Sequence, residues 1–269
     1  MNFVIDGIRY FVETCGKGHP LLVLHGFTGD HSTWTPFYKQ WAQHSTLYAL
    51  DIVGHGKTDS PADVEDYQIL RAAEDLHRFL EQNQIEKTDV LGYSMGGRLA
   101  LTFAIQYPEK VRRLILESAS PGLETAEERH ERVQKDEQLA LFIRNEGIEA
   151  FVEYWENIPL FASQKLLSTE KQRELRRQRL TNLPHGLANS LLGMGTGSQP
   201  SWWEQLGKLP NSTLLITGSI DKKFCMIAEQ MRAKMKNAKW ITVENCGHAI
   251  HVEKPEKFGT IVSEFLSNL

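Results

Sequence analysis

One short segment carries the residues best suited to chemistry. Residues 92–97 (GYSMGG) follow the apolar run 89–91 and match the pattern G-x-S-x-G. In this pattern a serine occupies a sharp turn between a strand and a helix, where its hydroxyl is exposed for reaction. The turn requires a sparsely populated backbone conformation at Ser94. The segment therefore predicts a reactive serine. The alternative is a Ser-Gly-rich turn without chemistry, and the presence or absence of partner residues for Ser94 must decide between the two.

A carboxylate and a histidine that can act with Ser94 follow later apolar segments. Asp221 comes shortly after segment 214–217, and His248 comes shortly after segment 240–243. Because the carboxyl ends of neighbouring parallel strands meet at one edge of a sheet, both side chains can converge on Ser94. The order serine, acid, histidine predicts a triad in which Asp221 orients His248 and His248 takes the proton from Ser94.

Each partner in this triad has a competitor. Glu117, at the end of the apolar segment 114–116, is the competing acid, and His251 is the rival base. Taken alone, Asp221 fits a turn or helix cap, and His248 fits a hydrogen-bonded loop histidine. Their order and their position at strand ends favour the triad.

A further motif supplies candidate oxyanion donors. The apolar run 21–24 leads into His25 and a glycine-containing loop that extends to residue 29. A His-Gly turn at this place donates one backbone N–H to an oxyanion, and the residue after the nucleophile donates the other. We therefore predict that the backbone amides of Phe27 and Met95 form an oxyanion hole. We interpret His25 itself as a structural histidine.

These separated motifs resemble the α/β-hydrolase family over essentially the whole chain. Segment 51–60 (DIVGHGKTDS) is similar to a turn that this family has after its next strand, and there we interpret His55 and Asp59 as structural. A serine at the elbow, in place of an aspartate, argues against the haloalkane dehalogenase and epoxide hydrolase branches. The resemblance implies an α/β fold with a mostly parallel sheet and helices on both faces.

Strand and helix signals alternate in two parts of the chain. Segments 3–5 and 9–14 are typical of a hairpin, and residues 67–82 have helical spacing. Short apolar segments predict buried parallel strands at 21–24, 47–50, 89–92 and 114–116. Residues 213–269 resume the pattern with two strands and a closing helix. We expect residues 1–118 and 206–269 to form one α/β-hydrolase core.

Residues 119–205 carry helix signals without an intervening strand. The capping-box pattern at residues 125–128 opens a helix predicted to reach about residue 145, and two further helices are predicted at 151–155 and 169–179. Inserted between two strands of a hydrolase core, these helices predict a cap over the site. Such a cap would shape substrate choice and exclude water.

Arg98 is the candidate specificity residue. It lies four residues after Ser94, about one helical turn along, so that it can face the pocket. Arginine suits bidentate capture of a carboxylate, and an exposed helix arginine is the alternative. Tyr93 can donate a phenolic hydrogen bond or fill the pocket. Arg129 and Arg179 are either further anion contacts or exposed cations.

Several segments together are similar to one family, the 2-succinyl-6-hydroxy-2,4-cyclohexadiene-1-carboxylate synthases of menaquinone biosynthesis. They are residues 92–98 (GYSMGGR), 120–123 (SPGL), 127–129 (EER), Trp155 with 159–161 (PLF), and 196–200 (TGSQP). The resemblance implies a lyase that eliminates pyruvate from 2-succinyl-5-enolpyruvyl-6-hydroxy-3-cyclohexene-1-carboxylate without consuming water. It implies that Ser94, Asp221 and His248 act as the base. It also implies that a substrate with three carboxylates contacts Tyr93, Arg98, Arg129, Trp155 and Arg179.

This reaction calls for no cofactor and no metal. The alternative within the same fold is a carboxylesterase, or a hydrolase of carbon–carbon bonds, that acts on an acidic substrate. A catalytically inactive receptor or scaffold is disfavoured by the intact triad and oxyanion motifs.

The bulk composition is compatible with this interpretation. The chain of 269 residues is long enough to bury a large core in one domain. A net charge of −4 without a basic block argues against nucleic acid and acidic membranes as partners, and no apolar stretch approaches the roughly 20 residues of a membrane span. Residues 1–6 lack a secretory pattern. Cys15, Cys225 and Cys246 are odd in number and widely spaced, which suits reduced thiols in the cytoplasm. We expect a small polycarboxylate substrate and no obligate protein partner.

Overall fold

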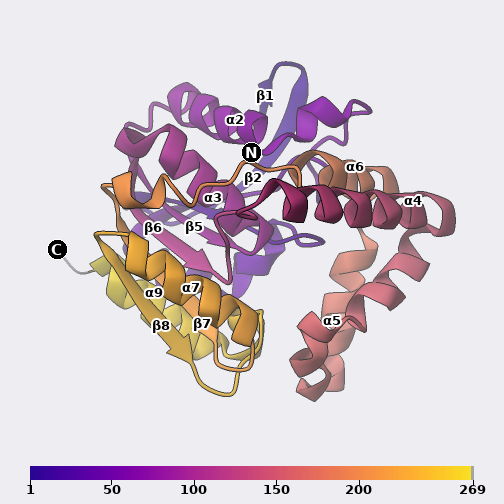
Figure 1. Ribbon diagram of the computed structural model, residues 1–269. Helices are drawn as coiled ribbons and strands as arrows, with labels where there is room; N and C mark the ends of the chain where they lie inside the picture. The colour runs from indigo at the N-terminus through magenta and orange to yellow at the C-terminus, as the bar shows by residue number, and fades with distance from the viewer. Residues whose placement is uncertain (268–269) are drawn as a thin grey trace.

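The computed structural model describes residues 1–267 as an eight-stranded sheet surrounded by helices (Figure 1). The strands lie in the order β1-β2-β4-β3-β5-β6-β7-β8. Their bounds are β1 Asn2–Ile5, β2 Ile8–Cys15, β3 His19–Leu24, β4 Ser45–Leu50, β5 Thr88–Tyr93, β6 Val111–Glu117, β7 Ser212–Gly218 and β8 Ala238–Val243.

Helices connect the strands from β3 onward. The α-helices are α1 Tyr38–Trp41, α2 Ile69–Gln82, α3 Met95–Gln106, α4 Ala126–Glu156, α5 Thr169–Leu180, α6 Pro184–Met194, α7 Lys222–Lys234, α8 Ile250–Glu253 and α9 Pro255–Ser267. The short 3₁₀ segments are η1 His31–Phe37, η2 Val64–Tyr67, η3 Pro108–Lys110, η4 Pro159–Leu166 and η5 Leu206–Lys208. Within residues 1–267, no helix is both long and apolar enough to cross a membrane.

The sheet is antiparallel at one edge and parallel elsewhere. β1 and β2 form the predicted hairpin, and its turn residues Asp6 and Gly7 have φ values of 48° and 85°, as two-residue hairpin turns require. β2 pairs antiparallel with β4, and all further neighbours up to β8 pair parallel. The carboxyl ends of β3, β5, β6, β7 and β8 therefore meet at one edge of the sheet.

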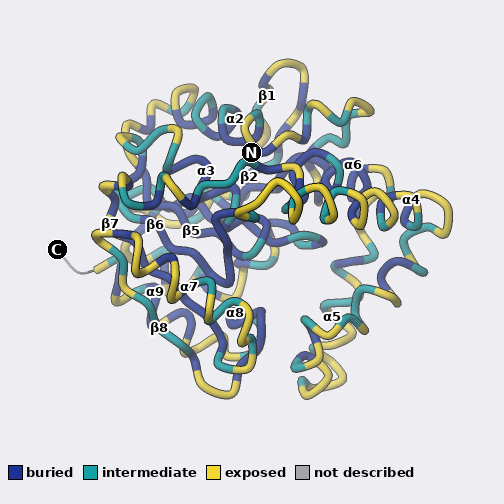
Figure 2. Tube along the Cα trace, viewed as in Figure 1, coloured by how far each residue is buried: buried dark blue, intermediate teal, exposed yellow. Residues whose placement is uncertain are grey.

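Apolar helix faces cover both sides of the sheet. On one side α2, α3 and α7 contribute Phe79, Phe103 and Met231 to one buried cluster. On the other side η1, α1 and α9 contribute residues such as Trp34 and Phe258 to a second cluster. Figure 2 shows the central strands, such as β5 and β6, among the most deeply buried parts of the chain, whereas the edge strand β1 is partly exposed. The predicted α/β fold, with a mostly parallel sheet between helical layers, is confirmed.

The chain between β6 and β7 is helical and contains no strand in residues 118–211, all of which are described. α4 begins with the predicted capping box, in which Thr125 and Glu128 each bind the other's backbone N–H. It continues to Glu156 through a bend at Gly147, where φ is 81° and ψ is −177°. The two helices predicted at 125–145 and 151–155 are thus halves of one bent element. α4 and α6 share a third buried cluster. The division into core and cap stays a prediction.

Candidate active site

Ser94 occupies the sharp turn between β5 and α3. Its φ of 50° and ψ of −106° are unfavourable for a residue that carries a Cβ. The turn is held by two backbone bonds of 2.9 Å, from Ser94 N–H to the Glu117 carbonyl and from Arg98 N–H to the Ser94 carbonyl. A side chain at Gly92 would collide with the carbonyl of Gly96. The strand and the helix can therefore approach this closely only with glycine at residue 92.

His248 joins Ser94 and Asp221 by two hydrogen bonds. Its Nε2 lies 3.0 Å from Ser94 Oγ, and its Nδ1 lies 2.7 Å from Asp221 Oδ2. The other carboxylate oxygen of Asp221 accepts the N–H of Phe224 at the start of α7, and the Phe224 ring packs against the His248 ring with centroids 4.5 Å apart. In this geometry a histidine can take a proton through the serine hydroxyl while the carboxylate stabilises the imidazolium. The structure therefore brings the three predicted triad residues together.

The competing acid and base form a separate pair. Both oxygens of Glu117 lie 2.9 Å from His251 Nδ1, and one of them also accepts the His251 backbone N–H. The two side chains are buried, and the His251 ring packs against Trp34 and Tyr93 with centroid distances of 5.3 and 4.5 Å. Glu117 is therefore the hydrogen-bond partner of His251 and does not contact His248 in place of Asp221.

Two further histidines near the site have structural contacts. His25 Nε2 accepts the Ile52 N–H at 3.0 Å, and its Nδ1–H donates to the Gly26 carbonyl at 2.8 Å. Burial lowers the pKa of His25, and burial lowers the pKa of His55 to about 3. Both rings are thus neutral at pH 7, which fits the structural roles expected for them.

A cavity of about 310 Å³ opens beside Ser94, between the sheet edge and the inserted helices. The predicted oxyanion residues Phe27 and Met95 both line it. Met95 is the first residue of α3, so its N–H belongs to a helix N-terminus, where partial positive charge favours an anion. From the opposite side the cavity is closed by Arg132, Trp155, Leu160, Phe161, Ser190, Leu191 and Met194.

Three cationic side chains line this cavity: Arg98, Arg132 and Lys223. Arg98 Nη1 donates to the Met194 carbonyl at 2.7 Å and to Gln199 Oε1 at 2.6 Å. Burial, followed by the charge of Arg132, lowers the pKa of Arg98 to about 10, so its guanidinium remains charged at pH 7. The predicted contacts Tyr93 and Trp155 also line the cavity. Arg132 is paired with Asp136, whereas both bonds of the Arg98 guanidinium go to uncharged oxygens, so the cavity favours an anionic ligand near Arg98.

Two of these cations were not predicted from the sequence. Arg132 follows Arg129 by three residues on α4, about one helical turn, and pairs with Asp136 at 2.9 Å. Lys223 lies in the first turn of α7, just after Asp221. Helical spacing from Arg129, and proximity to the predicted acid, are the signals that could have identified them.

Arg129 is not among the residues that line the cavity, although it bonds the backbone of Leu123, which is. Its guanidinium donates to the carbonyl oxygens of Leu123 and Glu124, at 3.2 and 3.1 Å. These bonds fix the loop that leads into α4. The predicted contact between Arg129 and the substrate stays a prediction.

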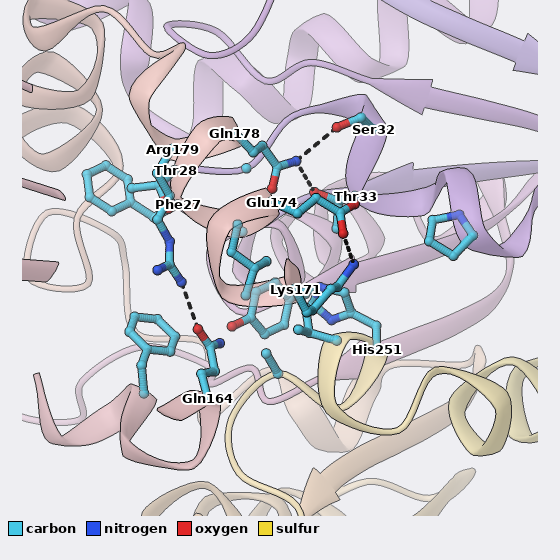
Figure 3. Close-up of a pocket in the computed structure, with 18 residues that line it drawn as sticks. Phe27, Thr28, Ser32, Thr33, Gln164, Lys171, Glu174, Gln178, Arg179 and His251 are labelled. Carbon is cyan, nitrogen blue, oxygen red and sulfur yellow. Dashed lines mark hydrogen bonds and ion pairs between the residues drawn. The ribbon is translucent and has the colours of Figure 1, made fainter. Parts of the chain in front are cut away.

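Arg179 lines a second, smaller cavity of about 110 Å³ (Figure 3). The two cavities share Phe27, Tyr93 and Phe161 as lining residues, so this aromatic group separates them. Arg179 donates to Gln164 Oε1 at 2.8 Å and packs over the Phe161 ring. Its predicted contact with the substrate also stays a prediction.

One group of potential metal ligands occurs in the described part of the chain: Asp30, His31 and Asp51. These groups are already bonded to protein donors. Asp51 accepts the His31 ring and backbone N–H groups and the Lys57 N–H, and Asp30 accepts the Ser32 N–H. We assign these contacts to bracing of the loop after β3.

Comparison with known proteins places this geometry in context. Residues 19–255 match the family described as alpha/beta hydrolase fold. A Bacillus subtilis protein provisionally named 2-succinyl-6-hydroxy-2,4-cyclohexadiene-1-carboxylate synthase is 46% identical over 268 residues, which cover 99% of this chain and 97% of the relative. A Photorhabdus laumondii protein named as the same synthase is 30% identical over 92% of this chain and 85% of its own length. The solved structure of MenH from S. aureus is 35% identical, has a TM-score of 0.91, and is matched over 97% of its length by 96% of this chain.

Proposed function

The chain belongs to the alpha/beta hydrolase fold family and, within it, to the 2-succinyl-6-hydroxy-2,4-cyclohexadiene-1-carboxylate synthases, and from this premise we propose how it works. It is a lyase that eliminates pyruvate from 2-succinyl-5-enolpyruvyl-6-hydroxy-3-cyclohexene-1-carboxylate. The observation that carries the function is 46% identity to a relative of this name over 99% of the chain.

The triad acts as a base. Ser94 Oγ takes the ring proton next to the succinyl carbonyl while His248 Nε2, 3.0 Å away, takes the hydroxyl proton of Ser94. Asp221 stabilises the imidazolium that forms. The electron pair of the broken C–H bond moves into the carbonyl and gives an enolate. A base that works by proton transfer alone needs no covalent intermediate on Ser94.

The enolate then expels the leaving group. Its electrons re-form the succinyl carbonyl, pass through the ring double bond and break the C–O bond to the enolpyruvyl group. The enolate of pyruvate leaves with that electron pair and takes up a proton to become pyruvate. The ring is left as the conjugated cyclohexadiene, and no water is consumed.

The remaining site residues stabilise charge and hold the substrate. The backbone amides of Phe27 and Met95 would donate to the enolate oxygen, which carries more charge in the transition state than the carbonyl does in the substrate. Arg98, with Arg132 and Lys223 in the same cavity, supplies positive charge for carboxylates. Tyr93 and Trp155 pack beside the ring, and Arg129 and Arg179 bind carboxylates from the two flanks.

We also propose the division of labour within the chain. Residues 119–205 form a cap over the core made by residues 1–118 and 206–269. The separate apolar cluster of α4 and α6 supports this division, as does the position of the larger cavity between the two parts. We place the protein in the cytoplasm because all three cysteines are free thiols.

The test is a direct assay of the elimination. With the enolpyruvyl substrate, the purified protein should release one pyruvate per turnover as the absorbance of the cyclohexadiene rises, and ¹⁸O from solvent should not enter the ring product. A carboxylesterase would incorporate the label into a new carboxylate and would cleave p-nitrophenyl esters rapidly. Ester cleavage without pyruvate release above the uncatalysed rate would refute the lyase.

A further inference from the structure

The turn that carries Phe27 contains a residue in an unfavourable conformation. The N–H of Gly29 donates to the Gly26 carbonyl at 3.0 Å and closes a four-residue turn. Within it Thr28 has a φ of 71°, which a β-branched residue adopts rarely. Such a conformation persists only where the surrounding structure imposes it. The contacts of Thr28 therefore decide how reliably the adjacent Phe27 amide is presented.

Asn182, just after α5, contacts this turn from the inserted helices. Its Nδ2 donates to the Thr28 carbonyl at 3.0 Å and to the Arg179 carbonyl at 3.1 Å. Asn182 is only 3% exposed, and its Oδ1 is buried without a hydrogen-bond partner among the described residues. A buried amide oxygen without a hydrogen-bond partner lowers stability. Its presence here indicates that the two bonds donated by Asn182 Nδ2 serve a purpose that offsets this cost. The donors tie the turn to the end of α5.

Gln178 lies one helical turn before Asn182 and reaches the next part of the same loop. Its Nε2 lies 3.0 Å from Asp30 Oδ1 and 3.1 Å from both Ser32 Oγ and Thr33 Oγ1. Figure 3 shows the contacts with Ser32 and Thr33 at the wall of the smaller cavity. Together the two amides connect the end of α5 to the loop from residue 28 to residue 33.

α5 has little other attachment to the core. Arg179 is its one buried residue, and the helix is largely exposed in Figure 2. Its ion pairs from Arg176 lead to Glu153 and Glu156 on α4, which also belongs to the inserted helices. A movement of α5 away from the core would therefore break the contacts of Gln178 and Asn182 and release the turn at Thr28.

We propose that Asn182 and Gln178 are positioning residues that present the Phe27 amide to the enolate oxygen only while α5 lies on the core. This inference rests on the proposed function, because that function gives the Phe27 amide its role. Seating of the inserted helices then completes the oxyanion hole, and proton removal is coupled to closure over the substrate.

The test uses four matched variants of the full chain. Asn182→Asp and Gln178→Glu replace the donating NH2 by an oxygen and keep the side-chain shape. Asn157→Asp and Gln172→Glu are the controls. They make the same changes at amides that bind only backbone carbonyls of the inserted helices: Asn157 donates to Glu153, and Gln172 makes its shorter bond to Leu167. Turnover of the enolpyruvyl substrate and amide hydrogen exchange of residues 26–33 are measured for each.

We expect kcat to fall about tenfold in Asn182→Asp and Gln178→Glu, with KM within about twofold of the wild type. This is less than the roughly 10²-fold that a 1 Å misplacement can cost, because the Phe27 amide is loosened and not removed. Exchange of residues 26–33 should be faster in these two variants and unchanged in the controls. Equal kcat values in test and control variants, or a change in KM alone, would overturn the proposal. If Asn182→Asp does not fold, the half-buried Gln178→Glu decides. If the wild type releases no pyruvate, the proposed function fails. Hydrogen exchange alone then tests whether Asn182 and Gln178 hold the loop of residues 28–33 in place.

Discussion

Two histidine–carboxylate pairs, His248–Asp221 and His251–Glu117, lie close together and differ in what surrounds the ring. In the first pair the far nitrogen of the imidazole meets Ser94 Oγ at 3.0 Å, at the wall of the larger cavity. In the second pair the ring is packed against Trp34, Tyr93 and Phe258 and borders the smaller cavity, with no bond to Ser94. A buried histidine with a carboxylate partner is therefore not by itself a catalytic signature. What distinguishes the first pair is the serine hydroxyl that its imidazole contacts.

The position of each carboxylate explains the difference. Glu117 is the last residue of β6 and lies within the sheet, with none of its surface exposed. Asp221 lies beyond the end of β7, where it caps α7 with its other oxygen. The loop position lets Asp221 reach His248, which lines the larger cavity, whereas the strand position keeps Glu117 in the core. We expect the first pair to govern turnover and the second to govern stability.

The largest effect should follow loss of the catalytic base. His248→Gln removes the group that receives the proton and should lower kcat by about 10⁴ or more. Ser94→Ala should do the same, and the double variant should be scarcely worse, because the residues act as one unit. Pyruvate release measures the loss, and thermal unfolding should show little change. Substantial residual turnover in His248→Gln would remove the distinction between the two pairs.

The second pair should show the opposite pattern. Glu117→Gln leaves His251 without its charged partner in a buried site and should lower the free energy of unfolding by about 3 kcal/mol. We expect kcat to fall by less than about tenfold, because His251 makes no bond to Ser94. Denaturant unfolding and steady-state kinetics measure the two quantities. A variant of native stability without turnover would reverse the roles assigned here.

A smaller effect should distinguish the cationic surroundings of the first pair. Arg98→Ala removes a contact to a substrate carboxylate, worth about 1.5–3 kcal/mol if charge-assisted, and should raise KM. Arg144→Ala is the matched control, since Arg144 also binds an amide oxygen, that of Asn189, but does not line the cavity. Equal KM values for these two variants would show that Arg98 is structural, bonding Met194 and Gln199, and does not contact the substrate.

The smallest effect concerns Cys246, which precedes His248 by two residues in the sequence and is fully buried. Burial, with the charge of Glu253 next, raises the pKa of its thiol to about 12. The reactive thiolate is therefore nearly absent at neutral pH. A disulfide reagent should modify Cys15 and Cys225, which are partly exposed, well before Cys246. Rapid native-state modification of Cys246 would mean that the second pair is open to solvent.

The elements that could be predicted are those specified within a few residues. The elbow needs Gly92 and Ser94 adjacent to a strand and a helix, and the hairpin needs its two turn residues. The triad partners are distant in sequence, but the rule that parallel strands end at a common edge placed Asp221 and His248 near Ser94.

The features that were missed depend on packing between distant segments. α6 contains Gly186, which disfavours a helix by local propensity, yet a side chain there would collide with the backbone of Gly54. Arg132 and Lys223 line the cavity only because α4 and α7 are oriented toward it. Helical spacing from Arg129 and proximity to Asp221 make both residues candidates, but the sequence alone does not specify how the two helices are oriented. The same holds for the contact of Asn182 with Thr28.

The sheet order also has a consequence for the folding of the chain. β6 and β7 are neighbours in space, but the whole of α4, η4, α5 and α6 separates them in sequence. Closing so long a loop is entropically unfavourable, and pairings of this kind form slowly. Asp221 and His248 follow β7 and β8 in the sequence, so the triad can assemble only after these two strands have paired with the sheet formed by the N-terminal strands. During refolding, recovery of activity should therefore lag behind recovery of secondary structure, and activity serves as a reporter of the final long-range step.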